Sequence, residues 1–443
     1  MTIFALSSGN GISGVAVIRI SGKEASSVIK LLTNKKLPLP RVATLRKINN
    51  INNSELIDEG IIIWFPGPKS YTGEDMAEIH VHGSKAVIQA LIKCISEIKN
   101  CKLAEPGEFT KKAFQNGKVN LLKAESIGDL IYSETEIQRK QAIKIMSGKH
   151  SKIYNSWRDS LIKVLANIEA KIDFPDENLP DNILNDIKTK TNKVKIEIAK
   201  VLEDQNVGER IREGFKVAIV GPSNAGKSSL LNYLSRREVA IVSETAGTTR
   251  DVIETHLNLS GLPVVLSDTA GIRESEDEIE KKGIRLALKK AEKADINIVV
   301  IEPKNAHFTG FLKDLITDKS ILVINKSDLG IDQLLDEFKK FKPIYISIKK
   351  EKNLEQLIST INEKLKNQFI NSENILITRE RHRQNLERCV SCLENFKNKN
   401  ESEDFDKAAE DLRMATRHLG MIVGKVDVEE VLGSIFNDFC IGK

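Results

Sequence analysis

The segment GPSNAGKSS, at positions 221–229, constrains the fold of this 443-residue chain more than any other stretch. It matches the phosphate-binding pattern G-x-x-x-x-G-K-[ST], follows the apolar run KVAIV and precedes the helical pattern SLLNYLSRR. In such a strand–loop–helix unit, backbone N–H groups and the helix dipole hold phosphates. Gly221 and Gly226 permit the tight backbone, and we expect Lys227 to reach the β- and γ-phosphates. Ser228 is the expected Mg²⁺ ligand, and the flanking elements argue against a chance glycine turn.

Two further motifs identify the base as guanine. DTAG, at 268–271, ends the run LPVVLS and places Asp268 near Mg²⁺ and the Gly271 amide near the γ-phosphate. NKSD, at 325–328, ends the run ILVI. The Asp328 carboxylate in this motif can accept two hydrogen bonds from the guanine amine and ring N–H, which adenine cannot supply. The order and spacing of these motifs are those of a GTPase.

A third segment is similar to the last guanine-contacting loop of GTPases. This segment is SIK, at 347–349, in which Ile348 stands in place of the more usual alanine. Because the loop acts mostly through backbone amides, the departure is mild. The full set of predicted GTP-binding residues is Asn224, Ala225, Gly226, Lys227, Ser228, Ser229, Ser243, Glu244, Thr245, Ala246, Gly247, Thr248, Thr249, Asp268, Thr269, Ala270, Gly271, Asn325, Lys326, Asp328, Ser347, Ile348 and Lys349.

The group that orients the attacking water is not evident from the DTAG motif. Ras-like enzymes use a Gln directly after this motif, whereas this chain has Ile272, which cannot orient water. The stretch that follows, RESEDEIEKKGI, is rich in carboxylates, most of which we interpret as a solvated acidic face. In the segment IVSETAGTTRDV, Thr249 is the expected switch residue that meets Mg²⁺.

Oxygen atoms gather beside the phosphates in these loops. Asn224 carries a side-chain oxygen, and residues 243–248 form a loop of small residues with accessible backbone carbonyls. Such oxygens could hold a monovalent cation that neutralises charge as an arginine finger does. A hydrolysis rate that is indifferent to exchange of K⁺ for Na⁺ would contradict this hypothesis.

The chain as a whole has the pattern of an α/β multidomain protein. Residues 1–117 read as an α+β domain, and helical periodicity follows over 118–210. Over 211–371, short apolar strands alternate with helical segments, which is typical of a doubly wound, Ras-like P-loop domain. Helix returns over 372–443. We therefore expect a G domain inserted into a helical domain, an arrangement that the usual closeness of domain termini permits.

Composition and charge limit the partners and the location. Lys plus Arg exceed Asp plus Glu by 67 − 62 = 5, an excess that permits contact with nucleic acid without proving it. No apolar run is long enough to cross a bilayer, and no secretory leader precedes MTIFALSSGN. We therefore expect a cytoplasmic protein with no membrane partner. The odd count of five cysteines points to reduced thiols.

Candidate metal ligands other than those of the nucleotide site are few. CVSC, at 389–392, lies in a helical pattern, and we favour plain helix packing over zinc binding. His80 and His82 share one face of a predicted strand, as two metal ligands might be placed. Because no third ligand is visible, we interpret them as structural residues.

Taken together, the motifs resemble the MnmE (TrmE) family of tRNA modification GTPases. The resemblance rests on GPSNAGKSSLLN, IVSETAGTTRDVIE, DTAGIRE, EIEKKGI, NKSD and the terminal FCIGK. It extends through VAVIRISG, FPGPKSYTGEDMAEIHVHG, PGEFTKKAFQNGKVNLLKAESIGDLI and IDFPDE, in order along essentially the whole chain. It implies an N-terminal domain that binds folate and forms a homodimer, in addition to the helical and G domains.

The resemblance also implies a reaction. Family members join the flavoprotein MnmG in a heterotetramer and modify carbon 5 of the wobble uridine of certain tRNAs, by aminomethyl or carboxymethylaminomethyl groups. The implied one-carbon donor is 5-formyltetrahydrofolate or a related folate. GTP hydrolysis in the family depends on K⁺, and the G domains dimerise across the nucleotide face. The family's potassium ligands fall on Asn224, Ser243, Thr245 and Thr248, and its water-orienting glutamate falls on Glu280.

The folate contacts of the family fall on Arg19, Glu78, Lys118 and the terminal Lys443. An Arg or Lys suits the glutamate carboxylate of folate, and a carboxylate suits the pterin N–H groups. Without the resemblance, each of these would read as an ordinary surface or strand residue. ALSSGNGISG stands where the family usually has the proline-containing loop ATPPGRGG, so the shape of the chain beside the folate stays open.

The end of the chain, FNDFCIGK, places Cys440 three residues from the carboxyl terminus. Asp427 and Glu430 form a capping-box pattern that predicts the start of a helix. Its apolar residues recur at helical spacing: Val428, Val431, Leu432, Ile435, Phe436 and Phe439. We expect this stripe to pin the terminus and Gly442 to let the last residues turn. The resemblance implies that Cys440 is required for modification, whether as nucleophile, acid or structural group, so Glu280 and Cys440 are the candidate catalytic residues.

Two other classes of function stay open. One is a ribosome-assembly or translation-associated regulatory GTPase, although no RNA-binding module is legible in the sequence. The other is a scaffold with a degenerate GTPase, against which the intact Lys227, Thr249 and Asp268 argue. Mass spectrometry of wobble uridines from a deletion strain separates tRNA modification from both.

Overall fold

The computed structural model describes most of the chain. The described residues are 1–9, 11–173, 182–222, 224–237, 240–241, 254–268, 289, 291–303, 316–330, 340–369, 375–399, 405–426, 432, 435–436, 439–440 and 442. The chain divides into two compact units, of which the first comprises Met1–Ile131, Ile145–Asp159 and Thr416–Lys443 and the second Tyr132–Lys144 and Ser160–Ala415. The four domain boundaries expected from the sequence stay a prediction.

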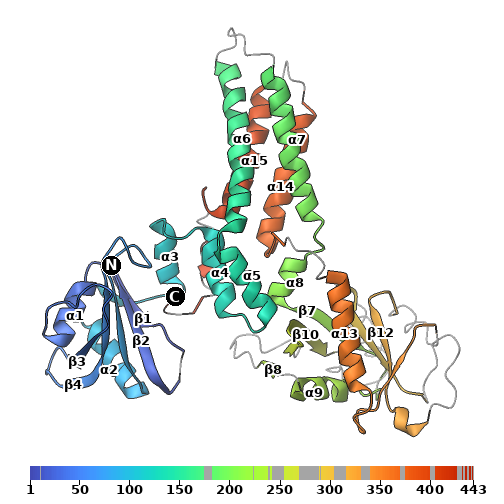
Figure 1. Cartoon of the computed structure of the whole chain (residues 1–443), viewed down its shortest axis with the longest axis horizontal. Coiled ribbons are helices and arrows are strands. Elements are labelled where there is room, and N and C mark those ends of the chain that lie inside the picture. The colour runs from blue at the N-terminus through green and yellow to red at the C-terminus, as the bar shows by residue number, and fades with distance from the viewer. Residues whose placement is uncertain are drawn as a thin grey trace, which may run out of the picture. The chain divides into compact units, whose positions relative to one another are not determined.

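A six-stranded sheet lies at the start of the first unit. Its strand order is β3 (Thr44–Asn49), β4 (Leu56–Phe65), β5 (Met76–Gly83), β2 (Ser13–Ser21), β1 (Thr2–Leu6) and β6 (Cys101–Leu103). β1 and β6 are parallel, and the other neighbouring strands are antiparallel. Helices α1 (Ala25–Thr33) and α2 (Lys85–Ser96) share one hydrophobic cluster with the strands, so both helices cover the same face (Figure 1).

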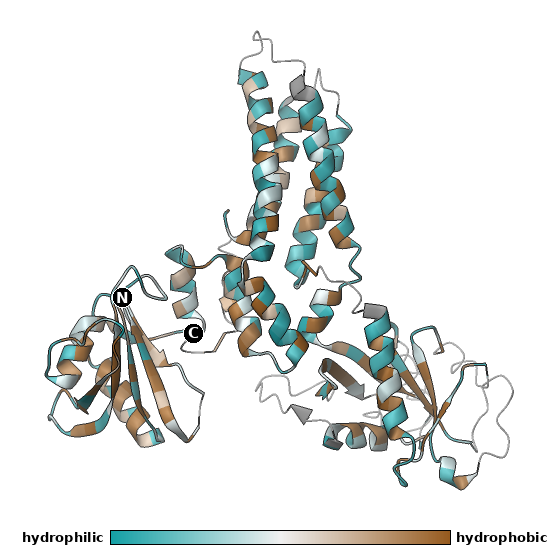
Figure 2. Cartoon of the chain, in the orientation of Figure 1, coloured by the Kyte–Doolittle hydropathy of each residue, from teal (hydrophilic) through white to brown (hydrophobic). Residues whose placement is uncertain are grey.

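Alternation along the strands decides which side chains face these helices. In β5, Ala77 and Ile79 are fully buried, whereas Glu78 between them points to the opposite face. The brown and teal residues that alternate along these strands in Figure 2 follow the same period. Because β2 pairs with β5 so that Arg19 lies opposite Glu78, both charged residues share the face that the helices leave uncovered.

The end of the chain packs against helices α3 (Glu108–Gln115) and α4 (Leu121–Ile131) of the first unit. One buried cluster joins Leu432, Ile435, Phe436 and Phe439 to Ala113, Val119, Leu121 and Ala124. The approach is close, because a Cβ added to Gly107 would lie 2.7 Å from the Phe436 carbonyl oxygen. The predicted burial of the apolar stripe is confirmed for these four residues. The predicted start of the helix, with Asp427, Val428, Glu430 and Val431, lies outside the described residues.

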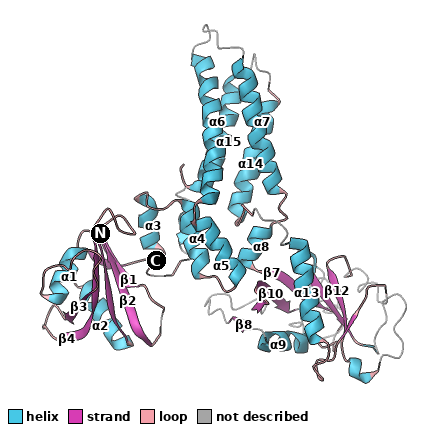
Figure 3. Cartoon of the chain, in the orientation of Figure 1, coloured by secondary structure: helices cyan, strands magenta, loops and turns pink. Residues whose placement is uncertain are grey.

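Five long helices account for most of the remaining helical structure that is described. They are α5 (Glu136–Met146), α6 (Lys149–Asp173), α7 (Asn182–Leu202), α14 (Glu380–Lys397) and α15 (Phe405–Val423). α7 and α14 pack side by side in the second unit (Figure 3). CVSC lies in α14, where Cys389 is buried, so this motif packs within a helix as predicted. Within the described ranges, no helix combines the length and apolar character that a membrane span needs.

The short helix α8 (Val207–Glu213) is tied to α14 by charge. Arg383 of α14 donates from Nε and Nη2 to the two carboxylate oxygens of Glu209, at 3.0 and 2.7 Å, and Nη2 also donates to Asp204 Oδ1 at 2.7 Å. Arg383 and Glu209 are each only 7% exposed. Burial alone would lower the pKa of Arg383, but hydrogen bonds and attraction from both carboxylates outweigh burial and raise that pKa.

A seven-stranded sheet forms the core of the rest of the second unit. Its order is β13 (Ile344–Tyr345), β12 (Ser320–Ile324), β11 (Ile296–Ile301), β7 (Phe215–Val220), β10 (Leu262–Asp268), β9 (Glu254–Leu259) and β8 (Ala240–Ile241). Strands β13 to β10 run parallel, and β9 and β8 pair antiparallel. Every residue of β11, INIVVI, is buried, as expected for a parallel strand covered on both faces.

Helices complete this α/β architecture. α9 (Lys227–Arg237) follows β7, and α13 (Leu354–Phe369) follows β13. The neighbouring residues Ile219 and Val220 of β7 belong to two different hydrophobic clusters, one on each face of the sheet. The predicted fold class, an α/β multidomain chain with a P-loop domain, is confirmed. The carboxyl ends of β7, β10 and β12 lie at one edge of the sheet, where α/β proteins bind ligands.

Candidate functional site

The phosphate-binding loop leaves β7 and leads into α9. Gly221, at φ +148°, approaches β11 so closely that an added Cβ would lie 2.0 Å from the Val300 carbonyl oxygen. Gly226, at φ +95°, would place a Cβ 2.2 Å from Nδ2 of Asn325. Only glycine meets both the conformation and the space at these two positions. The loop therefore has the close backbone cradle that phosphate binding requires.

Polar side chains of the loop lie around this cradle. Lys227 is the first residue of α9, and its Nζ donates a hydrogen bond to the Pro222 carbonyl oxygen at 2.7 Å. Ser228 and Ser229 follow it in the first turn of α9, and both are exposed. Asn224 is also exposed and adopts φ +63°. The predicted Mg²⁺ ligand Ser228 and the predicted K⁺ ligand Asn224 are thus accessible from solvent.

Asn325 joins the guanine motifs to the phosphate-binding loop. Its Nδ2 donates to the Ala225 carbonyl oxygen at 2.9 Å, and its Oδ1 accepts from the Ile348 backbone N–H at 3.4 Å. The side chain is buried, with 3% exposure. The structure therefore brings NKSD, SIK and the phosphate-binding loop into one site.

Asp328 lies at the surface of this site with its carboxylate held in place. Ser347 Oγ donates to Asp328 Oδ1 at 2.6 Å. This hydrogen bond is the largest cause that keeps the pKa of Asp328 below its ordinary value. The carboxylate is therefore charged at neutral pH and can accept hydrogen bonds, which is the property that guanine recognition requires.

Lys326 has a partner that the sequence analysis did not predict. Its Nζ lies 2.5 Å from Oε2 of Glu302, the residue that follows β11. Lys326 itself adopts φ +59°. The only sequence signal for Glu302 is its position directly after the apolar run INIVVI, because parallel strands end at the same edge of a sheet.

Part of the predicted nucleotide site lies outside the described residues: Ser243, Glu244, Thr245, Ala246, Gly247, Thr248, Thr249, Thr269, Ala270, Gly271 and Glu280. Asp268 is the last residue of β10 and lies beside Ile219 of β7 in parallel register. Because Gly221 follows β7 directly, the strand that carries Asp268 ends at the same edge as the phosphate-binding loop.

A second candidate site lies on the uncovered face of the N-terminal sheet. Arg19 donates from Nε and Nη2 to Glu78 Oε1, at 3.1 and 2.9 Å. Its guanidinium carbon lies 5.7 Å from the centre of the Tyr71 ring and 5.8 Å from that of Phe109. Burial raises the pKa of Tyr71, so the ring carries a neutral hydroxyl that bonds Thr110 at 2.8 Å. Aromatic rings stabilise a cation at such distances.

Lys118 lies near this site through the loop that follows β4. A Cβ added to Gly73 would lie 2.8 Å from Cε of Lys118, so the lysine stem packs on this loop. Asn116 Nδ2 holds the same loop by donating to the Thr72 carbonyl oxygen at 2.7 Å. Tyr71, which contacts Arg19, precedes these residues. Of the four predicted folate contacts, Arg19 and Glu78 meet directly, Lys118 shares their loop, and Lys443 lies outside the described residues.

The two histidines of β5 have protein partners. His82 places Nδ1 2.9 Å from Asp58 Oδ1, and its backbone N–H donates to Asp58 Oδ2 at 2.8 Å. Burial alone would raise the pKa of Asp58, but these hydrogen bonds outweigh burial and lower that pKa. His80 places Nε2 3.4 Å from Glu78 Oε2. Both contacts support the interpretation of these histidines as structural.

Cys440 lies in the first unit with its side chain exposed. Its backbone carbonyl accepts a hydrogen bond from the Gly107 N–H at 3.5 Å. Cys94, Cys101 and Cys389 are buried and Cys392 is half-buried, so Cys440 is the cysteine that solution reagents reach most easily.

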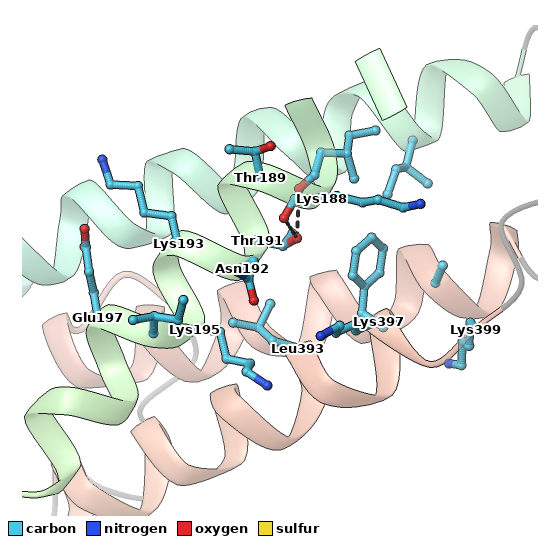
Figure 4. Close-up of a pocket in the computed structure, with 15 residues that line it drawn as sticks. Lys188, Thr189, Thr191, Asn192, Lys193, Lys195, Glu197, Leu393, Lys397 and Lys399 are labelled. Carbon is cyan, nitrogen blue, oxygen red and sulfur yellow. Dashed lines mark hydrogen bonds between the residues drawn. The ribbon is translucent and has the colours of Figure 1, made fainter. Parts of the chain in front are cut away.

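Helices α7 and α14 line a separate cavity of about 1040 Å³, shown in Figure 4. Apolar side chains such as Leu393 and Phe396 line it together with five lysines: Lys188, Lys193, Lys195, Lys397 and Lys399. Lys195 pairs with Glu394 at 3.2 Å, and Lys399 pairs with Asp411. None of the residues predicted for GTP or folate lines this cavity.

Comparisons with known proteins cover the whole chain. The family model of the GTP-binding protein TrmE N-terminus matches residues 2–118, and the model of the MnmE helical domain matches residues 121–440. The chain is 69% identical to the tRNA modification GTPase MnmE of Pelagibacter ubique (strain HTCC1062), over 100% of both chains. It is 46% identical to the protein of the same name from Rickettsia bellii (strain RML369-C), also over 100% of both.

Solved structures match a smaller part of the chain. The crystal structure of Aquifex aeolicus Era bound to GDP and AlF4⁻ is 28% identical, and the match covers 42% of this chain and 68% of that one, with a TM-score of 0.28. The G domain of the T. maritima FeoB iron transporter is 27% identical, and the match covers 34% of this chain and 98% of that one, with a TM-score of 0.26.

Proposed function

Because the chain belongs to the MnmE family of tRNA modification GTPases and is a GTP hydrolase, we propose that it couples GTP hydrolysis to modification of carbon 5 of the wobble uridine in certain tRNAs. The product carries an aminomethyl or carboxymethylaminomethyl group, and 5-formyltetrahydrofolate or a related folate supplies the one-carbon unit. The chain acts in the cytoplasm as a homodimer that joins the flavoprotein MnmG in a heterotetramer. Its substrate is tRNA.

The observation that carries the nucleotide half of this proposal is the junction at Asn325. This residue bonds both the phosphate-binding loop and the SIK loop, so one side chain sets the spacing between phosphate and base subsites. The glycine cradle beside it fits a phosphate chain, and Lys227 supplies the cation that phosphates need. The proposed metal ligands are Ser228 and Thr249 for Mg²⁺, and Asn224, Ser243, Thr245 and Thr248 for K⁺. Bound K⁺ adds positive charge beside the phosphates.

The observation that supports the folate half is the pairing of Arg19 with Glu78. A guanidinium donor and a carboxylate acceptor lie within hydrogen-bond distance of each other, beside two aromatic rings. Folate offers carboxylates, N–H donors and a flat ring, which match these three kinds of group. We propose Arg19, Glu78, Lys118 and Lys443 as the folate contacts.

Glu280→Ala is expected to keep GTP affinity and lose turnover. A side chain that orients the attacking water is needed only for the chemical step, and its removal slows such steps by about 10²–10⁴-fold. The measurement is phosphate release in K⁺ and in Na⁺, with nucleotide affinity determined in parallel. Glu274→Ala, in the same acidic stretch, is the control that should behave as wild type. Unchanged turnover of Glu280→Ala would refute its role, and equal wild-type rates in K⁺ and Na⁺ would refute the K⁺ site.

Cys440→Ser is expected to abolish tRNA modification and to leave GTP hydrolysis intact. The nucleotide loops lie in the second unit, whereas Cys440 lies in the first, so the substitution separates the two activities. The measurement is mass spectrometry of wobble uridines from a deletion strain that expresses each variant, with GTP hydrolysis by the purified protein. Cys392→Ser, on α14, is the matched control. Loss of both activities would indicate unfolding instead of a role for the thiol.

The same deletion strain tests the whole proposal. Strain extracts should lack the carbon 5 modification, and the wild-type chain should restore it. Normal wobble uridines in the deletion strain, together with accumulated ribosome precursors, would replace the proposal by the ribosome-assembly alternative.

A further inference from the structure

Gly442, near the end of the chain, lies in close contact with the end of the first strand. Its carbonyl oxygen accepts hydrogen bonds from Ser7 Oγ at 2.8 Å and from Arg19 Nη1 at 3.4 Å. At φ +96°, a Cβ added to Gly442 would lie 2.1 Å from the Leu6 carbonyl oxygen. A side chain at this position would therefore separate the two segments.

The backbone on both sides of this contact is held independently. The Ser7 N–H donates to the Val17 carbonyl oxygen at 2.7 Å, and Ser8 Oγ accepts from the Val17 N–H at 3.2 Å. These bonds continue the ladder between β1 and β2, so the Ser7 hydroxyl is presented from a fixed backbone. At the other end of the terminal segment, Phe439 is buried with 6% exposure. Chain ends usually fray, but this one is attached on both sides of Cys440.

We propose that Ser7 is a positioning residue, whose hydroxyl latches the Gly442 carbonyl and thereby sets where the Cys440 thiol lies. The inference rests on the proposed function for its consequence, because Cys440 matters there for tRNA modification. The geometry of the latch is independent of that function. Ser7 belongs to the segment ALSSGNGISG, which departs from the proline-containing loop of the family. A proline at this position would offer neither the hydroxyl nor the backbone N–H, so the latch is a property of the serine.

The latch is tested first without reference to activity. The full-length protein is treated in its native state with a carboxypeptidase, and intact-mass spectrometry follows the loss of terminal residues. Ser7→Ala removes the shorter of the two hydrogen bonds to Gly442, and a bond of this kind shifts a local equilibrium by about 2- to 10-fold. Trimming tracks the population of the released terminus, so its rate should rise by the same factor. Ser7→Thr, which keeps the hydroxyl, should restore the wild-type rate.

Ser96→Ala is the matched control, because the Ser96 hydroxyl is exposed and bonds only the nearby Lys93 carbonyl oxygen. It should leave trimming unchanged. Equal trimming of Ser7→Ala and wild type would overturn the latch.

The consequence is tested in the deletion strain. Ser7→Ala should lower wobble-uridine modification while GTP hydrolysis and the thermal midpoint stay unchanged, and Ser7→Thr should restore modification. Faster trimming with normal modification would overturn the positioning role. If the wild-type chain itself restores no modification, the proposed function fails, and the trimming rates alone still decide the latch.

Discussion

Gly226→Ala is expected to weaken GTP binding by about 100-fold, which corresponds to about 3 kcal/mol of strain at a backbone conformation that only glycine adopts easily. The added methyl group would lie 2.2 Å from Nδ2 of Asn325. Asn325 cannot move away without cost, because it is buried and bonds both Ala225 and Ile348. The substitution therefore strikes the phosphate and base subsites together. Titration calorimetry with a slowly hydrolysed GTP analogue measures the affinity.

Gly14→Ala is the control for this experiment. A Cβ at Gly14 meets no atom within 4 Å, so this variant should bind the analogue as wild type does. Circular dichroism of both variants establishes that they fold. Wild-type affinity of a folded Gly226→Ala protein would show that the cradle tolerates a side chain and that the nucleotide lies elsewhere.

Arg383→Met is expected to destabilise the second unit by about 3–5 kcal/mol, the usual cost of removing one partner of a buried ion pair. The substitution keeps the apolar stem but leaves the carboxylates of Glu209 and Asp204 in a buried site without their cation. One oxygen of Asp204, Oδ2, is already buried and has no hydrogen-bond partner among the described residues. The measurement is the midpoint of thermal denaturation, followed by far-UV circular dichroism.

Arg413→Met supplies the comparison that makes this result specific. Arg413 pairs with Glu169 at 3.1 Å, but these side chains are 49% and 41% exposed. Exposed pairs of this kind contribute about 0–1 kcal/mol, so the midpoint should barely change. Similar midpoints for the two variants would mean that the Arg383 network is as dispensable as a surface ion pair.

The nucleotide loops could be predicted from the sequence because each is a contiguous unit. A strand, a glycine turn and a helix that follow one another carry their geometry in their own order, so Gly221, Gly226 and Lys227 were placed correctly. Asn325 was assigned to the site by its motif alone. Its bond to Ala225 depends on two strands that are distant in sequence ending at one edge, which the parallel order of the sheet provides.

Partners that come from different elements could not be predicted. The opposition of Arg19 and Glu78 depends on the register of β2 against β5, and a bulge between Ser13 and Ala16 shifts that register. Tyr71 and Phe109, which lie against Arg19, come from a loop and a helix whose approach no local pattern reports. The latch between Ser7 and Gly442 joins residues at opposite ends of the chain. Such contacts follow from topology and were found only in the folded structure.

The hydrogen bond from Lys227 to Pro222 has a consequence for how nucleotide arrives. A phosphate that reaches the loop does not meet an idle ammonium group but replaces a neutral carbonyl acceptor with a charged one. The free energy gained is therefore the difference between a charge-assisted and an ordinary hydrogen bond, which is smaller than the full strength of the new bond. In return, the lysine is already oriented when the loop is empty, so little side-chain entropy is lost on binding. Nucleotide exchange at this loop is thus a substitution between two acceptors of one donor, and the loop remains ordered in between.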